Sequence, residues 1–100
     1  MSKLTEQARG RDCMIRVPGF CSFDSSTVVA CHWRDAAITG KGQRAPDILA
    51  AWGCHICHGI VDSYGASVGL DRDYVRLLHA EGIIRTQYYL LSHNIVRIAR

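Results

Sequence analysis

The chain has 100 residues, of which 48% are hydrophobic, and a formal net charge of +3 at pH 7. This length predicts one domain with a small core, and no segment approaches the roughly 18 consecutive apolar residues of a membrane span. We therefore expect no membrane partner. The polar start MSKLTEQARGRD lacks the apolar run of a secretory signal, which favours a cytoplasmic protein.

Five cysteines are present, and an odd number cannot all pair within one chain. Disulfides are rare in a reducing compartment, so the cysteines indicate metal ligation or thiol chemistry. The mild positive charge permits a nucleic-acid partner without requiring one.

Residues 1–11 are predicted to be a loose basic arm, and residues 12–100 a single domain. The stretch CMIRVPGFC contains two short apolar pieces around a Pro-Gly turn. Such a turn predicts a knuckle that brings Cys13 and Cys21 together.

Two short strands are predicted after the knuckle. The β-branched stretch SSTVVACHW is typical of a strand that ends at His32 and Trp33. A polar loop rich in Gly and basic residues follows, and ILAAW then predicts a second short strand or a turn of helix.

Helices are predicted in the second half of the chain. CHICHGIVDSYG favours a short helix with Cys54 near its first turn and Gly65 as its stop, which closes a core over residues 12–65. A C-terminal helical region over residues 71–92 has Asp71 as a fair N-cap, Gly82 as an expected break, and NIVRI as a possible closing strand. Its apolar residues recur at helical spacing: Tyr74, Leu77, Leu78, Ile84, Tyr88 and Leu91.

The cysteine spacing predicts a structural zinc site. Cys54 and Cys57 lie three residues apart at a helix start, where one turn directs both sulfurs the same way. Together with Cys13 and Cys21 they offer four thiolates, a set that suits tetrahedral Zn²⁺ and adds folding energy to a small core. The alternative is a group of reduced core cysteines without a metal.

The stretch CHICH also permits two other chemistries. A covalent haem site would leave Cys13 and Cys21 unexplained and offers only Met1 and Met14 as poor axial ligands. A thioredoxin-like dithiol lacks the surrounding βαβ pattern.

Several blocks of the sequence resemble one family. ARGRDCMIRVPGFC, VVACHWR, GKGQRAPDILAAWGCHICHGIVD and EGIIRTQ together are similar to the YbcO-like family of putative prophage nucleases, over most of the chain from Ala8 to about Gln87. The order of knuckle, strand, loop, strand and helix also resembles HNH endonucleases. The resemblance implies an α+β, treble-clef ββα-metal domain with a zinc knuckle and a C-terminal helix.

By position, the resemblance implies that His32 is the general base of a metal-dependent endonuclease and that His58 binds the catalytic ion, Mg²⁺, Mn²⁺ or Ni²⁺. An imidazole can take a proton from water near neutral pH, and a divalent ion neutralises charge on the phosphate. Other interpretations stay open: His32 as a partly buried, hydrogen-bonded residue, and His58 as a helix-surface residue or zinc ligand. Asp47 is either a turn residue or an orienting or metal-binding group, and Asp62 is expected to be an ordinary helix carboxylate.

One position departs from the broad HNH pattern. Cys31 precedes the expected base, where an Asp or His usually completes the metal site. A soft thiol suits Mg²⁺ badly. Strand alternation predicts that Cys31 points into the core, away from His32, which leaves His58, water and the substrate phosphate to bind the ion.

Basic residues predict the partner. Lys41 and Arg44 in the Gly-containing loop, with Arg9, Arg11 and Arg34, are candidates for phosphate contacts or for a solvated surface. We expect DNA as the substrate. The alternatives are a non-catalytic, zinc-stabilised nucleic-acid-binding module and a small structural adaptor. The C-terminal helix either covers the core or pairs with a second copy in a homodimer.

Overall fold

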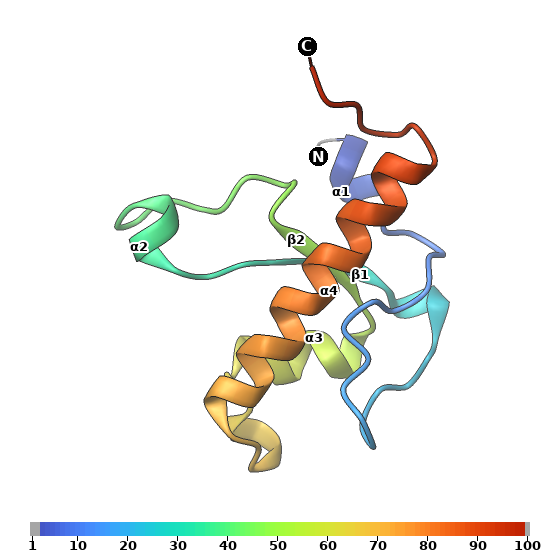
Figure 1. Cartoon of the computed structure of the whole chain (residues 1–100). Helices are drawn as coiled ribbons and strands as arrows, with labels where there is room; N and C mark the ends of the chain where they lie inside the picture. The colour runs from blue at the N-terminus through green and yellow to red at the C-terminus, as the bar shows by residue number, and fades with distance from the viewer. Residues whose placement is uncertain (1–2, 100) are drawn as a thin grey trace.

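The computed structural model describes residues 3–99 and shows an α+β arrangement around one short sheet (Figure 1). Residues 1, 2 and 100 lie outside the described part, as do the predictions made for them. The elements in chain order are α1 (Lys3–Glu6), a 3-10 turn (Ser25–Thr27), β1 (Val29–His32), α2 (Ala36–Thr39), β2 (Ala50–Gly53), α3 (His55–Asp62), a second 3-10 turn (Ala66–Val68) and α4 (Arg72–Ser92).

The N-terminal segment is more ordered than a loose arm. Residues 3–6 form α1, Leu4 packs against the core, and Ala8 is buried. Arg11 donates hydrogen bonds to the backbone and side-chain oxygens of Gln7 and to the hydroxyl of Tyr89. The hydrogen bond to Tyr89 and the packing of Leu4 and Ala8 are tertiary contacts, so a basic, polar composition alone does not reveal them.

The knuckle forms as predicted. The carbonyl of Val17 accepts hydrogen bonds from the amides of Phe20 and Cys21, which closes a tight turn. Gly19 has φ of 81°, a left-handed conformation that glycine adopts at little cost. The turn reverses the chain between Cys13 and Cys21.

The two strands form an antiparallel pair in which Val29 lies opposite Gly53, and His32 opposite Ala50. Every residue of β2 is buried, whereas in β1 only Cys31 is. Because successive side chains of a strand point to opposite faces, Cys31 enters the core and His32 faces the other way. Of the two predictions for ILAAW, a short strand or a turn of helix, the strand is the one that forms, as β2.

Helix α3 begins where the sequence indicated but ends at Asp62, three residues before the predicted stop at Gly65. Cys54 is its N-cap, and the Cys54 Sγ accepts a hydrogen bond from the amide of Cys57. After the helix, Gly65 adopts φ of 88°, and a Cβ there would lie 2.7 Å from the carbonyl oxygen of Leu70. Both the conformation and the space require glycine.

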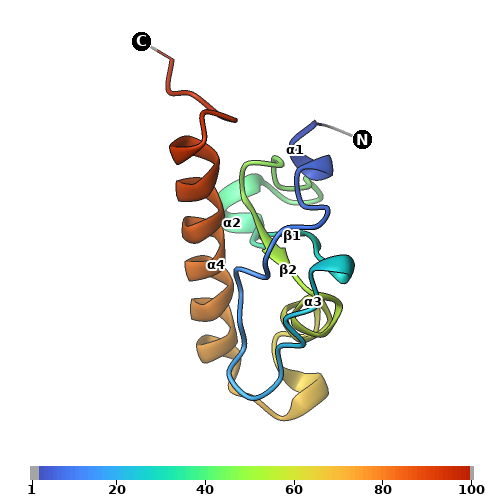
Figure 2. The same ribbon diagram turned by 90° about the vertical axis from the view of Figure 1, so that its right-hand side faces the viewer.

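Helix α4 runs across the sheet and forms one side of the molecule, as two perpendicular views show (Figures 1 and 2). Asp71 caps it by accepting a hydrogen bond from the amide of Tyr74. Its buried face contacts β2, where the Thr86 hydroxyl oxygen accepts a hydrogen bond of 3.0 Å from the amide of Trp52. Its buried residues are Val75, Leu78, His79, Gly82, Ile83, Thr86 and Leu90.

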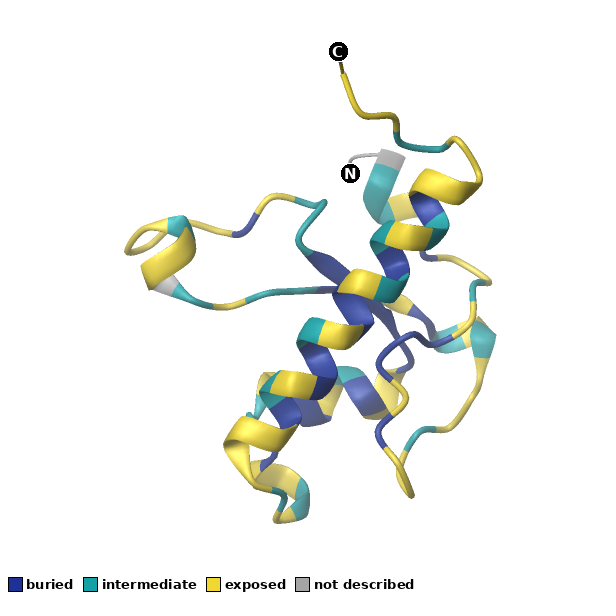
Figure 3. Cartoon of the chain, viewed as in Figure 1, coloured by how far each residue is buried: buried dark blue, intermediate teal, exposed yellow. Residues whose placement is uncertain are grey.

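Two expectations about this region were wrong. The helix continues through Gly82, and residues 93–99 contain no strand. The apolar residues that the sequence places at helical spacing are mostly exposed, and of that set only Leu78 is buried; Figure 3 shows exposed segments of α4 in yellow. The sequence has apolar side chains on two faces of α4, and periodicity alone does not say which one meets the core.

Gly82 is explained by the close approach of α4 to the knuckle segment. A Cβ at this position would lie 3.1 Å from the Ile15 Cα and 3.1 Å from the Met14 carbonyl oxygen. Both neighbours are backbone atoms, which cannot move as easily as a side chain.

We predict that Gly82→Ala destabilises the protein although Ala favours helices. Overpacking against backbone costs about 1–3 kcal/mol, more than the ~1 kcal/mol that Ala contributes in a helix. Gly59→Ala in α3 is the matched control, because a Cβ there meets nothing within 4 Å. Urea unfolding in excess zinc should show Gly59→Ala to be more stable than wild type and Gly82→Ala less stable. Equal stabilisation by both substitutions would contradict the close packing.

Candidate functional site

Four cysteines converge where the knuckle meets the start of α3. The sulfurs of Cys13, Cys21, Cys54 and Cys57 all lie within 4.8 Å of one another. The Sγ atoms of Cys21 and Cys54 are 3.9 Å apart, close to the ~3.8 Å edge of a tetrahedron with metal–sulfur bonds of about 2.3 Å. All but Cys21 are buried, and all are reduced. The group could hold a metal ion such as zinc.

The electrostatics of the cluster fit a cation. A hydrogen bond with Cys57 lowers the pKa of Cys13 to about 4, and the same bond raises the pKa of Cys57. The hydrogen bond therefore favours one thiolate within the pair of Cys13 and Cys57. Metals bind thiolates and not thiols, and repulsion between neighbouring thiolates keeps some of the cysteines protonated. A bound dication would offset this repulsion and allow all four sulfurs to be thiolates.

His32 lies at the end of β1 and is held by a carboxylate. Its Nε2 is 2.7 Å from Oδ1 of Asp47, and the His32 side chain is 13% exposed. The guanidinium of Arg44 lies 3.4 Å from the same nitrogen. Arg44 cannot accept a hydrogen bond, so a proton on Nε2 is donated to the Asp47 carboxylate. Arg44 then places a positive charge close to the ring. Asp47 was predicted to be a turn residue or an orienting or metal-binding group. In the structure its carboxylate contacts His32, as the orienting role requires.

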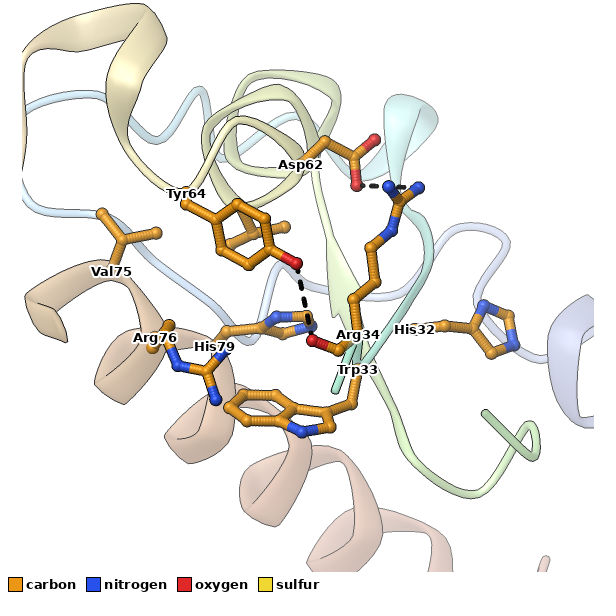
Figure 4. Close-up of a pocket in the computed structure, with 9 residues that line it drawn as sticks. His32, Trp33, Arg34, Asp62, Tyr64, Val75, Arg76 and His79 are labelled. Atoms are coloured by element: carbon orange, nitrogen blue, oxygen red, sulfur yellow. Dashed lines mark hydrogen bonds and ion pairs between the residues drawn. The ribbon is translucent and has the colours of Figure 1, made fainter. Parts of the chain in front are cut away.

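A second histidine–carboxylate pair lies on α3. Nε2 of His58 is 3.2 Å from Oδ2 of Asp62, one helical turn later. Arg34 reaches the same carboxylate, with its Nη2 3.5 Å from Oδ1, and Figure 4 shows the Arg34 side chain extending from the end of β1 to Asp62. Asp62 was expected to be an ordinary helix carboxylate. Its spacing from His58 is a signal that could have singled it out.

His32 of the first pair and both residues of the second pair line one cleft of about 660 Å³. Its walls come from the end of β1, the loop that contains α2, and the exposed side of α3. The residues that line it include His32, Arg34, Thr39, Gly40, Gly42, Arg44, His58, Asp62 and Tyr64. The cleft therefore combines two imidazoles, the carboxylates of Asp35 and Asp62, and two guanidinium groups on a partly open surface.

The end of β1 is fixed from behind by α4. His79 donates a hydrogen bond of 2.9 Å from Nε2 to the carbonyl of Cys31, and burial lowers the pKa of His79, which keeps its ring neutral. Arg76 lies over the Trp33 ring at 4.6 Å and pairs with Asp35 at 3.3 Å. Figure 4 shows His32 and Trp33 pointing to opposite sides of the chain, so the contacts of Trp33 and His79 position the strand end without occupying the His32 side.

The remaining candidate residues lie elsewhere or play other parts. Arg11 stacks over Trp52 and Tyr89 and is engaged by Tyr89 through a hydrogen bond, away from the residues that line the cleft. Lys41 is exposed on the loop, between two glycines that line the cleft. Cys31 is 1% exposed, and burial raises its pKa to about 12, so it is a neutral core thiol.

The family model and the curated relatives that match this chain are all described as putative nucleases. The family model described as "Putative nuclease YbcO" matches residues 2–95. The "Putative nuclease YbcO" of Escherichia coli K12 is 34% identical over 97% of this chain and 99% of its own length, and the relative from Enterobacteria phage 82 matches to the same extent. A solved structure described as a putative bacteriophage protein from Escherichia coli K-12 is similar with a TM-score of 0.75 and 31% identity, over 90% of this chain and 98% of that one. On the extent of these matches, the chain belongs to the YbcO family of putative nucleases.

Proposed function

We propose that the protein is a metal-dependent endonuclease of the HNH type that hydrolyses phosphodiester bonds in nucleic acid, with DNA as the substrate. The observation that carries the proposal is the placement of His32, paired with Asp47, in the same cleft as His58 and Asp62. The family name supports a hydrolase acting on nucleic acid. Five free cysteines suit a cytoplasmic enzyme.

His32 is proposed to be the general base. Asp47 accepts the hydrogen bond from Nε2–H, which favours the tautomer in which Nδ1 is unprotonated. Nδ1 then takes a proton from the attacking water, and the carboxylate stabilises the imidazolium that forms. The half-buried position of the ring keeps its orientation fixed, while the cleft gives substrate access.

The catalytic ion is proposed to bind at His58 and Asp62. Their nitrogen and oxygen are 3.2 Å apart, near enough to ligate one cation, and a mixed imidazole and carboxylate donor set favours Mn²⁺ or Ni²⁺ over Mg²⁺. A divalent ion there supplies Lewis-acid neutralisation of the phosphate charge. Arg34, on the same carboxylate, helps to orient Asp62 in the free protein.

Zinc at the four cysteines is proposed to be structural, in a treble-clef arrangement. Four thiolates close the coordination shell and leave no position for water or substrate. The site connects the knuckle to the first turn of α3, and His58 directly follows the ligand Cys57. Zinc therefore acts on the chemistry by fixing the helix that carries His58.

Nucleic acid is proposed to lie along the loop that contains α2. Arg34, Lys41 and Arg44 surround the mouth of the cleft with positive charge, and phosphate contacts of this kind position a strand without reading its sequence. We leave Arg11 out of this surface because its guanidinium is engaged by Gln7 and Tyr89.

We predict that Cys54→Ala abolishes metal binding and unfolds the protein, because loss of one thiolate opens the tetrahedron. The control is Cys31→Ala, which removes an equally buried sulfur outside the cluster and should cost about 1 kcal/mol while retaining the metal. Elemental analysis and circular dichroism of both purified variants would check this. Equal zinc contents in the two variants would argue against the assignment.

We predict that His32→Ala lowers the rate of DNA cleavage by about 10²–10⁴, because proton abstraction is lost. Asp47→Asn should lower it less, since the base remains but its tautomer is no longer fixed. His93→Ala is the control, because His93 is exposed beyond the end of α4. Nicking of supercoiled, branched and single-stranded DNA would measure the rates. If His32→Ala binds and cuts like wild type, the site assignment fails; binding without cutting in the wild type would identify a non-catalytic nucleic-acid-binding module.

We predict that His58→Ala and Asp62→Asn both raise the concentration of Mn²⁺ needed for half-maximal cleavage, since each removes one donor to the ion. The loss of one ligand typically costs at least ten-fold in affinity. Titrating cleavage with Mg²⁺, Mn²⁺ and Ni²⁺ tests this, with His55→Ala as the exposed histidine control on the same helix. An unchanged metal requirement in both variants would place the ion elsewhere.

A further inference from the structure

The outer face of α4 carries a row of apolar side chains that the fold does not use. Tyr74, Leu77, Ile84, Tyr88 and Leu91 are 40%, 56%, 64%, 73% and 40% exposed. The buried residues of α4 lie on the opposite side, against the sheet and knuckle. Figure 2 shows α4 at one edge of the molecule, with the other elements all to one side of it. Nothing within the described chain covers this row.

The spacing of the row is that of a helix–helix seam. Leu77, Ile84 and Leu91 recur every seven residues, and Tyr74, Glu81 and Tyr88 do the same three residues earlier. The steps between them alternate between three and four, which is the pattern of a and d positions in a coiled coil. We call these six residues the α4 seam.

We propose that the α4 seam binds the α4 seam of a second copy of this chain, with the two helices antiparallel. Two-fold symmetry about a point between residues 82 and 83 places Glu81 opposite the partner's Ile84. The same register places Leu77 opposite the partner's Tyr88, and Tyr74 opposite the partner's Leu91. Every seam residue thus meets another seam residue, and each aromatic ring meets an aliphatic side chain.

The charge of Glu81 selects the antiparallel orientation. In a parallel pair the two Glu81 carboxylates would face each other at one level of a desolvated seam, which is unfavourable. In the antiparallel register, Arg85 lies at nearly the level of the partner's Glu81. Arg85 is partly buried, and its Nη1 donates a hydrogen bond of 2.7 Å to the Met14 carbonyl, which holds the guanidinium beside α4. The opposite charges of Glu81 and Arg85 are therefore complementary across the pair.

The area is sufficient for a weak, specific dimer. The exposed parts of the five apolar side chains amount to about 500 Å² per copy, or roughly 1,000 Å² for the pair, which reaches the lower limit of specific interfaces. The seam also continues into an apolar groove of about 260 Å³ beside the loop that contains α2. The groove is lined by Trp33, Ile38, Leu49, Ala80, Ile83 and Ile84.

Sedimentation equilibrium of the zinc-loaded full chain tests the proposal, which is independent of any catalytic activity. Wild type should form a dimer, and Ile84→Asp should weaken association roughly 100-fold or more, because a carboxylate would be placed in the seam. Ile98→Asp is the matched control: Ile98 is 77% exposed and lies outside α4, so the dimer should persist. Zinc content and circular dichroism verify that each variant is folded, and Leu77→Asp provides a second seam variant should Ile84→Asp fail to fold.

Glu81→Gln tests the orientation. It should weaken an antiparallel dimer several-fold through loss of the pair with Arg85, whereas it would strengthen a parallel dimer by removing carboxylate repulsion. A wild-type protein that stays monomeric at about 1 mM, or a folded Ile84→Asp that dimerises as tightly as wild type, would overturn the proposal. Monomeric wild type whose folded Leu77→Asp or Ile84→Asp variant loses DNA affinity would instead assign the seam to nucleic acid.

Discussion

The convergence of four cysteine sulfurs at one point restricts how the knuckle, the sheet and α3 can be arranged. The sheet consists of two four-residue strands, and a two-stranded sheet is marginal by itself in water. The core of a 100-residue chain is also small. The cluster joins Cys13 and Cys21 of the knuckle to Cys54 and Cys57 at the start of α3, so segments far apart in sequence are fixed at one point. Without a cation, burial and mutual repulsion keep most of these sulfurs protonated, whereas a metal ion such as zinc could bind all four as thiolates.

The cleft follows from this constraint because its groups are close in sequence to the elements that the cluster fixes. His32 ends the strand paired with β2, and β2 leads through Cys54 directly into α3. His58 and Asp62 are then set by the rotation of that short helix. From the opposite side, α4 holds the end of β1 through the hydrogen bond between His79 and the Cys31 carbonyl. The loop that contains α2 is the part of the cleft least tied to the core, and it carries the exposed basic residues.

Local signals predicted those parts of the fold that local chemistry determines. Capping by Asp71, the helix start near Cys54, the Pro-Gly turn and the strand ending at His32 could all be predicted from residue type and spacing. Tertiary packing decided the rest. Gly82 is required by its close approach to the backbone of Ile15. The packing face of α4 is set by which of its two apolar rows contacts β2. Hydrophobic periodicity predicts neither of these features. The pairing of His32 with Asp47 spans a loop, so residue type leaves it as one alternative among several. The pairing of His58 with Asp62 follows directly from their i, i+4 spacing on α3.

A zinc ion bound by four thiolates would fix the helix that carries His58. X-ray absorption at the zinc edge of the purified protein can detect this site, because it reports the atoms bound to the metal without relying on activity. We expect a coordination shell of four sulfurs at about 2.3 Å and no nitrogen or oxygen ligand. A shell that includes histidine nitrogen, or fewer than four sulfurs, would contradict the closed structural site and with it the proposed role of His58.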